Sequence, residues 1–338
     1  DETAYITGDN IGVTVTLKDA AGNPITGEAS SLTSSTVTVP NATINGSWTD
    51  NSNGTYSATY VAGLAGTGLT ATVKLAGWTN PKDAAATYDI TASTTPAQST
   101  STIAVDQSAY TAGADMKVTV TLKDSGGNAV TGASSSLTAD AVEVPNATLK
   151  SDSWTDGGDG TYTATWTATT AGTSLKAKVT LEGWSKAAES QAYAIAEISG
   201  ISVNGHTFKG REEPAFPTTA FTGAFFNIEV TGADVSKLKW TSSDDNVQVD
   251  EGKVIFIGRP VRSSVSIEAT LDGYRVVNYE FNIKRWFITP LSKQIELWPV
   301  AEDKCNKQGG ILPALSSLGN TTTVGSWLGD WKSVLKIS

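Results

Sequence analysis

VTVTLKDAAGNPITGEASSLT, residues 13–33, is the stretch that decides the fold class, because apolar and polar residues alternate along its first part. Val13, Val15 and Leu17 would lie on one face of a strand, and the side chains between them on the other. The Gly-Asn-Pro that follows is typical of a turn. The segment therefore predicts a β-strand with one buried face, followed by a reversal of the chain.

The same stretch recurs 105 residues later as VTVTLKDSGGNAVTGASSSLT, residues 118–138, with fifteen of twenty-one positions identical. A second pair of segments matches after one extra residue before Trp154: WTDNSNGTYSATY (48–60) and WTDGGDGTYTATW (154–166). A period of this length indicates a duplicated domain rather than a short solenoid repeat.

The Asp- and Asn-rich parts of the second pair of segments have two interpretations. Asp50, Asn51 and Asn53, like Asp156 and Asp159 in the second copy, carry hard oxygen atoms of the kind that calcium binds. The same residue types also form the turn of a hairpin between two alternating strands. Their spacing does not fit the EF-hand loop, which closes with a Glu. We therefore predict a hairpin, and calcium binding there stays open.

Each copy contains several short strands separated by turns over about a hundred residues, which favours an immunoglobulin-like β-sandwich. The chain has one Cys, so no disulfide can cross the sheets and the core must depend on apolar burial. We expect four Trp residues to pack in the cores or at their rims, namely Trp48, Trp78, Trp154 and Trp184.

The length of 338 residues predicts roughly two to four domains. The composition changes near residue 198, because all five Arg residues lie within residues 198–289. KLKWTSSDDNVQVD and KVIFIG in this block predict strands of a second kind of sandwich, with SSDDN (242–246) as a solvated turn. The domains we predict are 1–92, 93–197, 198–289 and 290–338.

The junctions between these domains differ in sequence. TASTTPAQSTST (91–102) is expected to be an exposed linker whose last residues enter a strand. AEISGISVNG (196–205) leaves little slack, so we expect a stiffer junction there. The first copy has no counterpart of TIAV (102–105), and we interpret it as lacking its first strand.

The period changes after Pro290. Leu297, Ala301 and Cys305 are spaced by four residues, which predicts a short amphipathic helix. A second helix is predicted from Ser326. In this segment we select Trp327, Trp331 and Lys332 as candidate partner contacts, the alternative being burial in a helix-to-sheet core.

Several function classes are disfavoured. The net charge of −10 repels the phosphate backbone of nucleic acids. The only His, His206, and the only thiol, Cys305, lie in different predicted domains, which argues against a catalytic Cys-His pair. We predict no enzyme, no catalytic residue, no cofactor site and no metal site.

The few thiols suit an extracellular protein, and no segment is apolar and long enough for a transmembrane helix.

VTVTLKD…GN…TG and DGTYTATW…AGT resemble the Big-1 repeats of the intimin and invasin adhesins, and residues 198–289 resemble their Big-2-type domain. WPVAEDKCNKQGGILP (298–313) resembles the first helix of a C-type lectin-like domain. The resemblance implies an all-β elongated array of tandem immunoglobulin-like sandwiches, followed by a short, incomplete α+β lectin-like segment. Such a domain closes with a second Cys, so Cys305 would lack its partner.

The resemblance also implies an inverse autotransporter, in which a β-barrel outside this chain anchors the array in the outer membrane. The chain would then be a virulence-associated bacterial surface adhesin fragment, extracellular, monomeric in solution and not itself inserted in the membrane. Its C-terminal tip would bind a host cell-surface or extracellular-matrix protein. The alternatives are a purely structural spacer array and an accessory module of a secreted polysaccharide-acting enzyme. An exposed apolar or basic patch on the Arg-containing domain, absent from the repeats, would favour the adhesin over the spacer.

Overall fold

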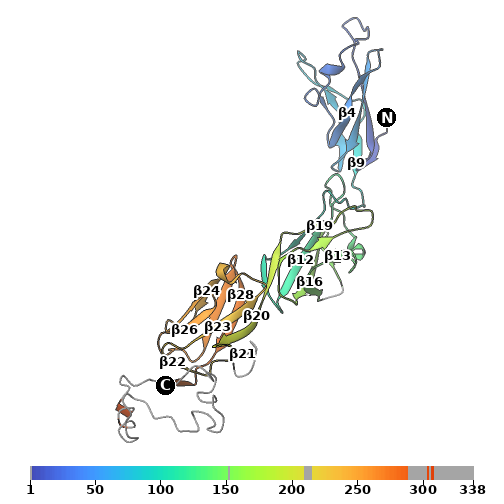
Figure 1. Ribbon diagram of the computed structural model, residues 1–338. Helices are drawn as coiled ribbons and strands as arrows, with labels where there is room; N and C mark the ends of the chain where they lie inside the picture. Colours follow the sequence, from blue (N-terminus) through green and yellow to red (C-terminus); the bar gives the residue numbers. More distant parts are fainter. Residues whose placement is uncertain (1, 151–152, 209–214, 288–302, 304–305, 308–338) are drawn as a thin grey trace.

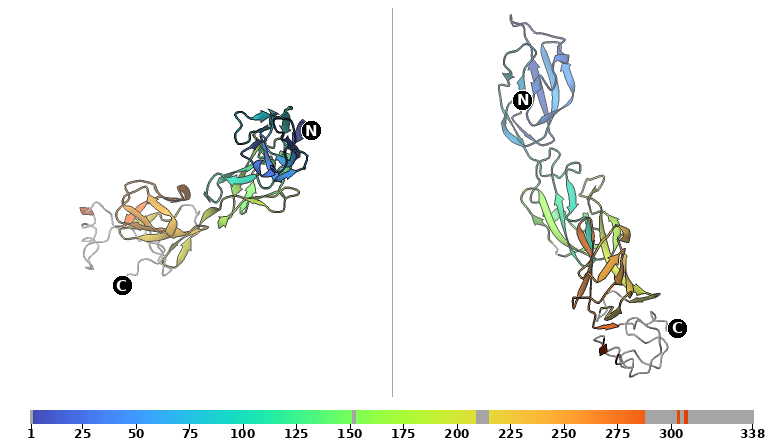
Figure 2. Two further views of the ribbon diagram at one scale, coloured as in Figure 1. Left: turned by 90° about the horizontal axis from the view of Figure 1, so that it is seen from above. Right: turned by 90° about the vertical axis from the view of Figure 1, so that its left-hand side faces the viewer.

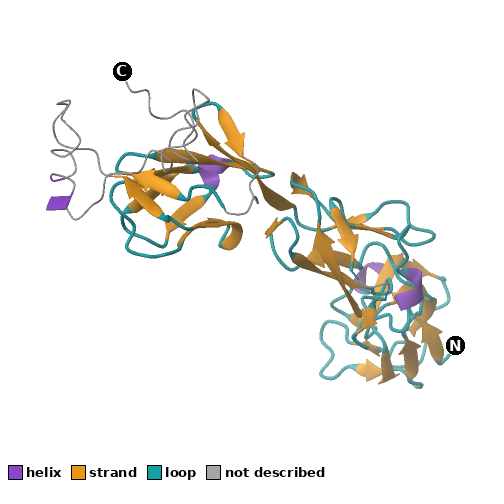
Figure 3. Ribbon diagram, turned by 90° about the horizontal axis from the view of Figure 1, so that it is seen from below, coloured by secondary structure: helices purple, strands orange, loops and turns teal. Residues whose placement is uncertain are grey.

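The computed structural model describes residues 2–150, 153–208, 215–287, 303, 306 and 307. These residues form three β-sandwich units arranged in an elongated row (Figure 1). The right view in Figure 2 shows the same extended order of the units. Strands dominate, and short 3₁₀ turns interrupt the loops (Figure 3) at η1 (Ala29–Ser31), η2 (Ser134–Ser136) and η3 (Val235–Lys237). The predicted all-β fold class is therefore confirmed.

The first unit, which we call the first repeat, is built from three three-stranded sheets of order β1-β9-β6, β2-β5-β4 and β3-β7-β8. Its strands are β1 (Ala4–Ile6), β2 (Asn10–Thr16), β3 (Val37–Thr38), β4 (Ala42–Asp50), β5 (Thr55–Ala62), β6 (Gly66–Leu69), β7 (Thr72–Val73), β8 (Lys82–Asp83) and β9 (Tyr88–Thr91).

The second repeat has the same plan with one more edge strand, because β10 pairs with β12 in the sheet β10-β12-β16-β14. Its strands are β10 (Thr102–Val105), β11 (Ala109–Thr111), β12 (Asp115–Thr121), β13 (Val142–Glu143), β14 (Ala147–Leu149), β15 (Thr155–Asp156), β16 (Thr161–Ala168), β17 (Gly172–Leu175), β18 (Lys178–Val179), β19 (Ala188–Glu189) and β20 (Tyr193–Val203).

The third unit begins on the second half of β20, which pairs with β23 and with the short hairpin strand β21. Its other strands are β21 (His206–Phe208), β22 (Thr219–Phe221), β23 (Phe225–Thr231), β24 (Lys239–Ser242), β25 (Val247–Asp250), β26 (Lys253–Phe256), β27 (Val265–Leu271), β28 (Tyr274–Phe281) and β29 (Arg285–Phe287). The predicted boundary at residues 197–198 falls inside β20, and the division of the chain into domains stays a prediction.

The alternation seen in the sequence sets which side chains are buried. Along β16, Tyr162, Ala164, Trp166 and Ala168 are all buried, while the Thr residues between them are partly exposed. Strand β5 repeats this pattern, with Tyr56 fully buried at its start. Since side chains of a strand alternate between the two faces, each such strand contributes one face to an apolar core.

The four Trp residues of the repeats do not share one environment. Trp48 and Trp154 are buried in the cores of the two repeats, as expected. Trp184 is half-buried, and its indole N–H donates to Pro96 O at 3.2 Å. Trp78 is 39% exposed, so the expectation of core or rim packing was wrong for it. The reason is that the linker segment preceding the second repeat covers Trp184, and no described segment makes such a contact with Trp78.

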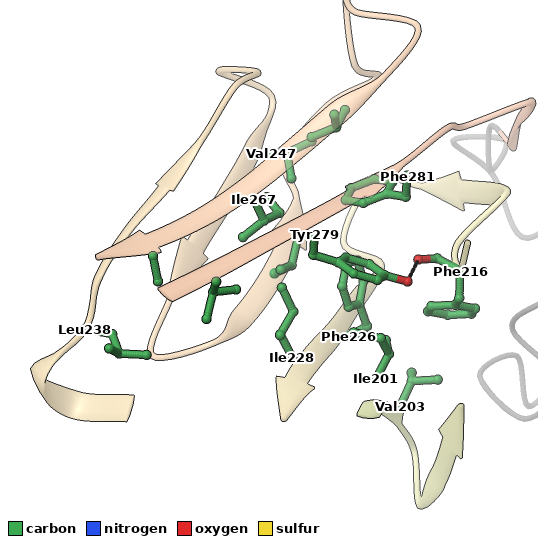
Figure 4. Packing of buried hydrophobic residues seen from close by; sticks show 14 of the residues in the cluster. Ile201, Val203, Phe216, Phe226, Ile228, Leu238, Val247, Ile267, Tyr279 and Phe281 are labelled. Atoms are coloured by element: carbon green, nitrogen blue, oxygen red, sulfur yellow. Dashed lines mark hydrogen bonds between the residues drawn. The ribbon is translucent and has the colours of Figure 1, made fainter. Parts of the chain in front are cut away.

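The third unit has a core richer in phenylalanine than the cores of the repeats. Phe226 lies edge-to-face against Phe216 and Phe281, with ring centroids 5.7 and 5.5 Å apart. Tyr279 keeps its hydroxyl inside this core by donating a hydrogen bond to Phe216 O at 2.5 Å (Figure 4). A buried polar group with a partner avoids the cost of desolvation, so the core stays closed around it.

Candidate functional site: the junctions and the far end of the array

The candidate contact residues selected from the sequence, Trp327, Trp331 and Lys332, lie outside the described residues, as do Cys305 and most of the predicted lectin-like segment. Of the first predicted helix the structure describes only Asp303, and beyond it Asn306 and Lys307, all in helical conformation. The role of the three contact residues stays a prediction. His206 is exposed on β21, directly after a turn.

The repeated Asp- and Asn-rich stretches are hairpin turns whose side chains bond to the turn itself and to the loop that contains Gly27 or, in the second repeat, Gly132. Asp50 accepts hydrogen bonds from the backbone N–H of Gly27 at 2.6 Å and of Ser52 at 2.8 Å. Asp156 accepts equivalent bonds in the second repeat. The predicted hairpin is therefore confirmed. Within the described ranges, no group of three or more His, Cys, Asp or Glu residues is placed to hold a metal ion.

The junction between the two repeats is organised by Asp124 and Asn128 of the second repeat. Asn128 Nδ2 donates to Thr7 Oγ1 at 2.9 Å and to Gly63 O at 3.2 Å, and Asn128 Oδ1 accepts from the N–H of Ala65 at 2.8 Å. Asp124 is buried and accepts from Asn128 Nδ2 at 2.9 Å. One amide side chain thus bonds to three groups of the neighbouring repeat.

The same carboxylate fixes the linker between the repeats. The N–H of Ser93 donates to Asp124 Oδ2 at 2.9 Å, and Thr100 Oγ1 donates to the backbone carbonyl oxygen of Asp124 at 2.7 Å. Ser101 is buried and also bonds to this loop. The expectation of an exposed linker holds for Thr94, Thr95 and Ser99 but was wrong for Ser101, whose side chain finds a backbone partner on the second repeat. The last residue of the linker does begin strand β10, as predicted.

The pKa of Asp124 reflects two opposing effects. Burial raises the pKa of this carboxyl, but hydrogen bonds from the Asn128 side chain, from two backbone N–H groups and from Thr7 lower it by more. The net result is a pKa below the ordinary value for Asp. The carboxylate is thus held in its charged form, in which it can accept all these bonds.

The first repeat carries the same loop, which bonds to no other unit among the residues that the structure describes. Asp19 accepts bonds from the N–H groups of Ala21 and Asn23 and from Asn23 Nδ2, all at 2.8 to 2.9 Å. Both Asp19 and Asn23 are exposed. The loop therefore folds by its own hydrogen bonds, and the second repeat uses it to bind the first.

The junction between the second repeat and the third unit is a continuous strand. Strand β20 pairs with β11 through its first half and with β23 through its second half (Figure 1). Thr111 Oγ1 donates to Arg275 O at 3.3 Å across the junction. A cavity of about 440 Å³ lies beside it, lined by residues of both units. The AEISGISVNG segment thus leaves no loop between the two units, and the stiffness of the junction stays a prediction.

One glycine permits the close approach at this junction. Gly232 has φ of +76°, and a Cβ placed there would lie 1.9 Å from Ile195 O and 2.8 Å from the N atom of Gly172. No side chain fits between these backbone atoms, and positive φ also disfavours other residues. Gly232 therefore lets the third unit pack directly on the second repeat.

The end of the third unit away from the repeats carries a loop between β26 and β27, residues 257–264, which we call the far-end loop. Val261 is 87% exposed on it, and Ile257 is also exposed. Arg259 and Arg262 flank Val261, are exposed, and form no ion pair with any residue that the structure describes. The far-end loop thus combines exposed apolar side chains with two exposed positive charges, of which that of Arg262 also acts on Asp244.

Asp244 holds this loop, and the expectation that SSDDN is a solvated turn was wrong for it. Asp244 is buried, whereas Asp245 is exposed. Asp244 Oδ2 accepts from the N–H groups of Val261 at 2.7 Å and Arg262 at 2.9 Å. The sequence gives no signal for this, because the partners lie seventeen and eighteen residues further along the chain.

The pKa of Asp244 is also set by competing effects. Burial raises the pKa of this carboxyl, while backbone hydrogen bonds from Arg262, Asn246 and Val261 and the positive charge of Arg262 lower it by more. The net pKa lies below the ordinary Asp value. The far-end loop is therefore fastened by a charged carboxylate.

Two family models match adjacent parts of the chain: invasin domain 3 matches residues 97–198, and invasin domain 4 matches residues 199–281. Together they span more than half of the chain. The chain belongs to the intimin/invasin family. Its relatives in this family are adhesins rather than enzymes, and they include inverse autotransporters.

The inverse autotransporter adhesin YeeJ of Escherichia coli (strain K12) is 29% identical to this intimin/invasin family member over 205 residues. The match covers 58% of this chain and 8% of YeeJ, so the chain spans a small part of that relative's length. The crystal structure of invasin, described as a bacterial integrin-binding protein, has a TM-score of 0.50 and 23% identity, covering 98% of this chain and 68% of that chain.

From the quoted motifs we also predict a particular likeness to the Escherichia coli adhesin FdeC. The FdeC structure is 22% identical, with a TM-score of 0.32, covering 82% of this chain and 93% of that chain. At that score the likeness to FdeC in particular stays a prediction.

Among the helices of the described residues, none has the length and apolar character to cross a membrane.

Proposed function

We propose that this chain is the distal part of a bacterial surface adhesin that binds a host cell-surface or extracellular-matrix protein. Its array would be displayed on the outer membrane, with the two repeats as a stalk and the third unit and residues 290–338 toward the host. Membership of the intimin/invasin family supports this proposal. The invasin relative is itself described as an integrin-binding protein, which makes a host protein the ligand class to test first.

The observation that carries the proposal over a purely structural spacer is the far-end loop. A spacer needs no exposed apolar side chain between two unpaired Arg residues at its end, and such a patch is typical of a contact surface. The repeats do expose Ile6, Leu64 and Trp78, but they contain no Arg. Exposed Lys74 and Lys82 flank Trp78 in the sequence, so the first repeat also carries basic residues near an exposed apolar one. What is confined to the third unit is the combination of exposed apolar side chains with Arg.

The position of the last described strand also supports placing the far-end loop at the end of the array that faces the host. The far-end loop starts where β26 ends, and Phe256 of that strand bonds to Ala224 beside β22. Strand β22 pairs with β29, the last described strand. The far-end loop and β29 thus lie at the same end of the third unit.

The test is binding of the whole chain to cultured host cells and to immobilised matrix proteins at physiological salt. A chain with Arg259→Glu and Arg262→Glu should bind more weakly than the unaltered chain. The control carries Lys74→Glu and Lys82→Glu, which reverse two exposed charges on the first repeat and should leave binding unchanged. A third chain with Trp327→Ala, Trp331→Ala and Lys332→Ala tests the predicted contacts. Failure of the unaltered chain to bind any of these surfaces would overturn the proposed function.

A further inference from the structure

The loop by which the second repeat contacts the first has a counterpart of similar sequence in the first repeat. We call residues 124–128, which read DSGGN, the docking loop; residues 19–23 of the first repeat read DAAGN. In both loops the N–H of the last residue donates to the carboxylate of the first, at 2.9 Å in the docking loop and 2.8 Å in its counterpart. Residues 19–23 are all exposed, whereas Ser125 is the one exposed residue of the docking loop.

The two loops differ at a position that decides how closely another repeat can approach. A Cβ placed on Gly126 would overlap the carbonyl oxygen of Gly63, and it would lie 2.6 Å from Gly63 C and 2.7 Å from Thr7 Cγ2. Carbon atoms in van der Waals contact are about 3.5–4.0 Å apart, so no side chain fits at this position. Ala21 occupies the equivalent position in the first repeat. Its Cβ would therefore block an approach of the same kind.

The backbone of the loop does not require a glycine at position 126. Gly126 does not have positive φ, whereas Gly127 has φ of +88° and its counterpart Gly22 has φ of +90°. The N–H groups of Ala21 and Gly126 donate to the Asp that begins each loop, at 2.9 and 3.0 Å. The loop thus folds in the same way with a side chain at this position. The missing side chain of Gly126 serves the contact with the first repeat.

The part of the first repeat that receives the docking loop is equally particular. We call Thr7, Gly63 and Ala65 the receiving surface. Thr7 Oγ1 accepts from Asn128 Nδ2 and donates to Gly63 O, both at 2.9 Å. Gly63 O accepts from Asn128 Nδ2 as well, at 3.2 Å. The docking loop therefore needs a hydroxyl group and an accessible backbone carbonyl at these positions.

The second repeat does not offer an equivalent receiving surface. Ala112 stands in place of Thr7, and Thr169 stands in place of Gly63. The hydroxyl is therefore missing from the position where the docking loop would need it. The third unit packs instead on the segment that follows Thr169, through the close approach of Gly232.

We propose that docking between the repeats is selective, with Gly126 and Asn128 of the docking loop matched to Thr7 and Gly63 of the receiving surface. The match fixes the order of the repeats, because the counterpart loop of the first repeat cannot make the same contact with Ala21 in it. The partner that fits the docking loop is a sandwich repeat with a Thr or Ser hydroxyl and a glycine carbonyl at these two positions. The selectivity does not depend on the proposed adhesive function.

Distances between labels on the two repeats test the selectivity in the whole chain, with Cys305→Ser and labels at the exposed positions Thr79→Cys and Asp140→Cys. Gly126→Ala should replace the narrow distance distribution of docked repeats with a broad one. The matched control is Ala21→Gly, which makes the reverse change in the exposed loop and should leave the distribution narrow. Far-ultraviolet circular dichroism should be unchanged in both variants, since the loop folds with Ala in the first repeat.

Substitutions of Thr7 test the receiving surface separately. Thr7→Val keeps the shape of the side chain but removes the hydroxyl, so the distribution should broaden. Thr7→Ser keeps the hydroxyl, and the distribution should stay narrow. A narrow distribution for Gly126→Ala, or equal distributions for the Val and Ser variants, would overturn the selective docking. Because no ligand is present, failure of the adhesin proposal would leave these results unaffected.

Discussion

Replacing Asn128 with Ala should loosen the junction between the two repeats without unfolding either of them. The side chain makes three hydrogen bonds to the first repeat, through Thr7 Oγ1, Gly63 O and Ala65 N. A net hydrogen bond stabilises a folded structure by about 1 kcal/mol, so about 3 kcal/mol of docking free energy should be lost. That corresponds to a shift of roughly 100-fold in the equilibrium between docked and undocked repeats.

The duplication supplies the control. Asn23 occupies the equivalent position in the first repeat, bonds to Asp19 in the same way and contacts no neighbouring unit. Asn23→Ala should therefore lose only the local bond, which is exposed and contributes roughly 0.5 kcal/mol.

Distances between labels on Thr79→Cys and Asp140→Cys, in a chain with Cys305→Ser, report the angle between the repeats. Both positions are exposed. The distribution should broaden for Asn128→Ala and stay narrow for Asn23→Ala. Equal distributions for the two variants would refute the assignment of Asn128 as the residue that holds the repeats together.

Three further predictions concern single residues. Gly232→Ala should destabilise the contact between the second repeat and the third unit by roughly 2–4 kcal/mol, because its Cβ would overlap Ile195 O; an unchanged melting temperature would contradict this. Asp244→Ala should lower the free energy of unfolding of the third unit by about 3 kcal/mol in denaturant unfolding, because three backbone N–H groups lose a charged acceptor. Asp245→Ala, a substitution of the exposed neighbour, should cost less than about 0.5 kcal/mol. The pKa values of Asp124 and Asp244 are lower in the folded chain than the ordinary value. The two carboxylates therefore stabilise the folded state fully above the unfolded pKa of about 3.9, and this contribution is lost as the pH falls through the lower folded pKa values. Asp124→Asn should flatten this acid dependence, and a denaturation profile identical to that of the unaltered chain would contradict the prediction.

The sequence predicted those features that depend on local pattern. The alternation around Val118 and Tyr162 marked the strands and their buried faces, and both residues are fully buried. The AEISGISVNG segment predicted a junction with little slack, and its residues 196–203 belong to β20, while Asn204 and Gly205 form the turn into β21.

The features that sequence reasoning missed depend on distant partners. Trp78 and Trp184 occur in the same Gly-Trp pattern, yet only Trp184 meets a linker that covers it. Asp244 and Asp245 are adjacent carboxylates, and only the position of the far-end loop decides which is buried. Such differences arise from tertiary packing, which neither periodicity nor turn chemistry encodes.

The most direct test of the adhesive account compares host-surface binding by the unaltered chain, by the Arg259→Glu and Arg262→Glu chain, and by the Lys74→Glu and Lys82→Glu chain. The account predicts that binding saturates with the unaltered chain, weakens when the charges at the far-end loop are reversed, and is unchanged when those on the first repeat are reversed. Equal loss of binding in both altered chains would show that net charge alone governs attachment. That result would contradict a contact surface at the far end of the array.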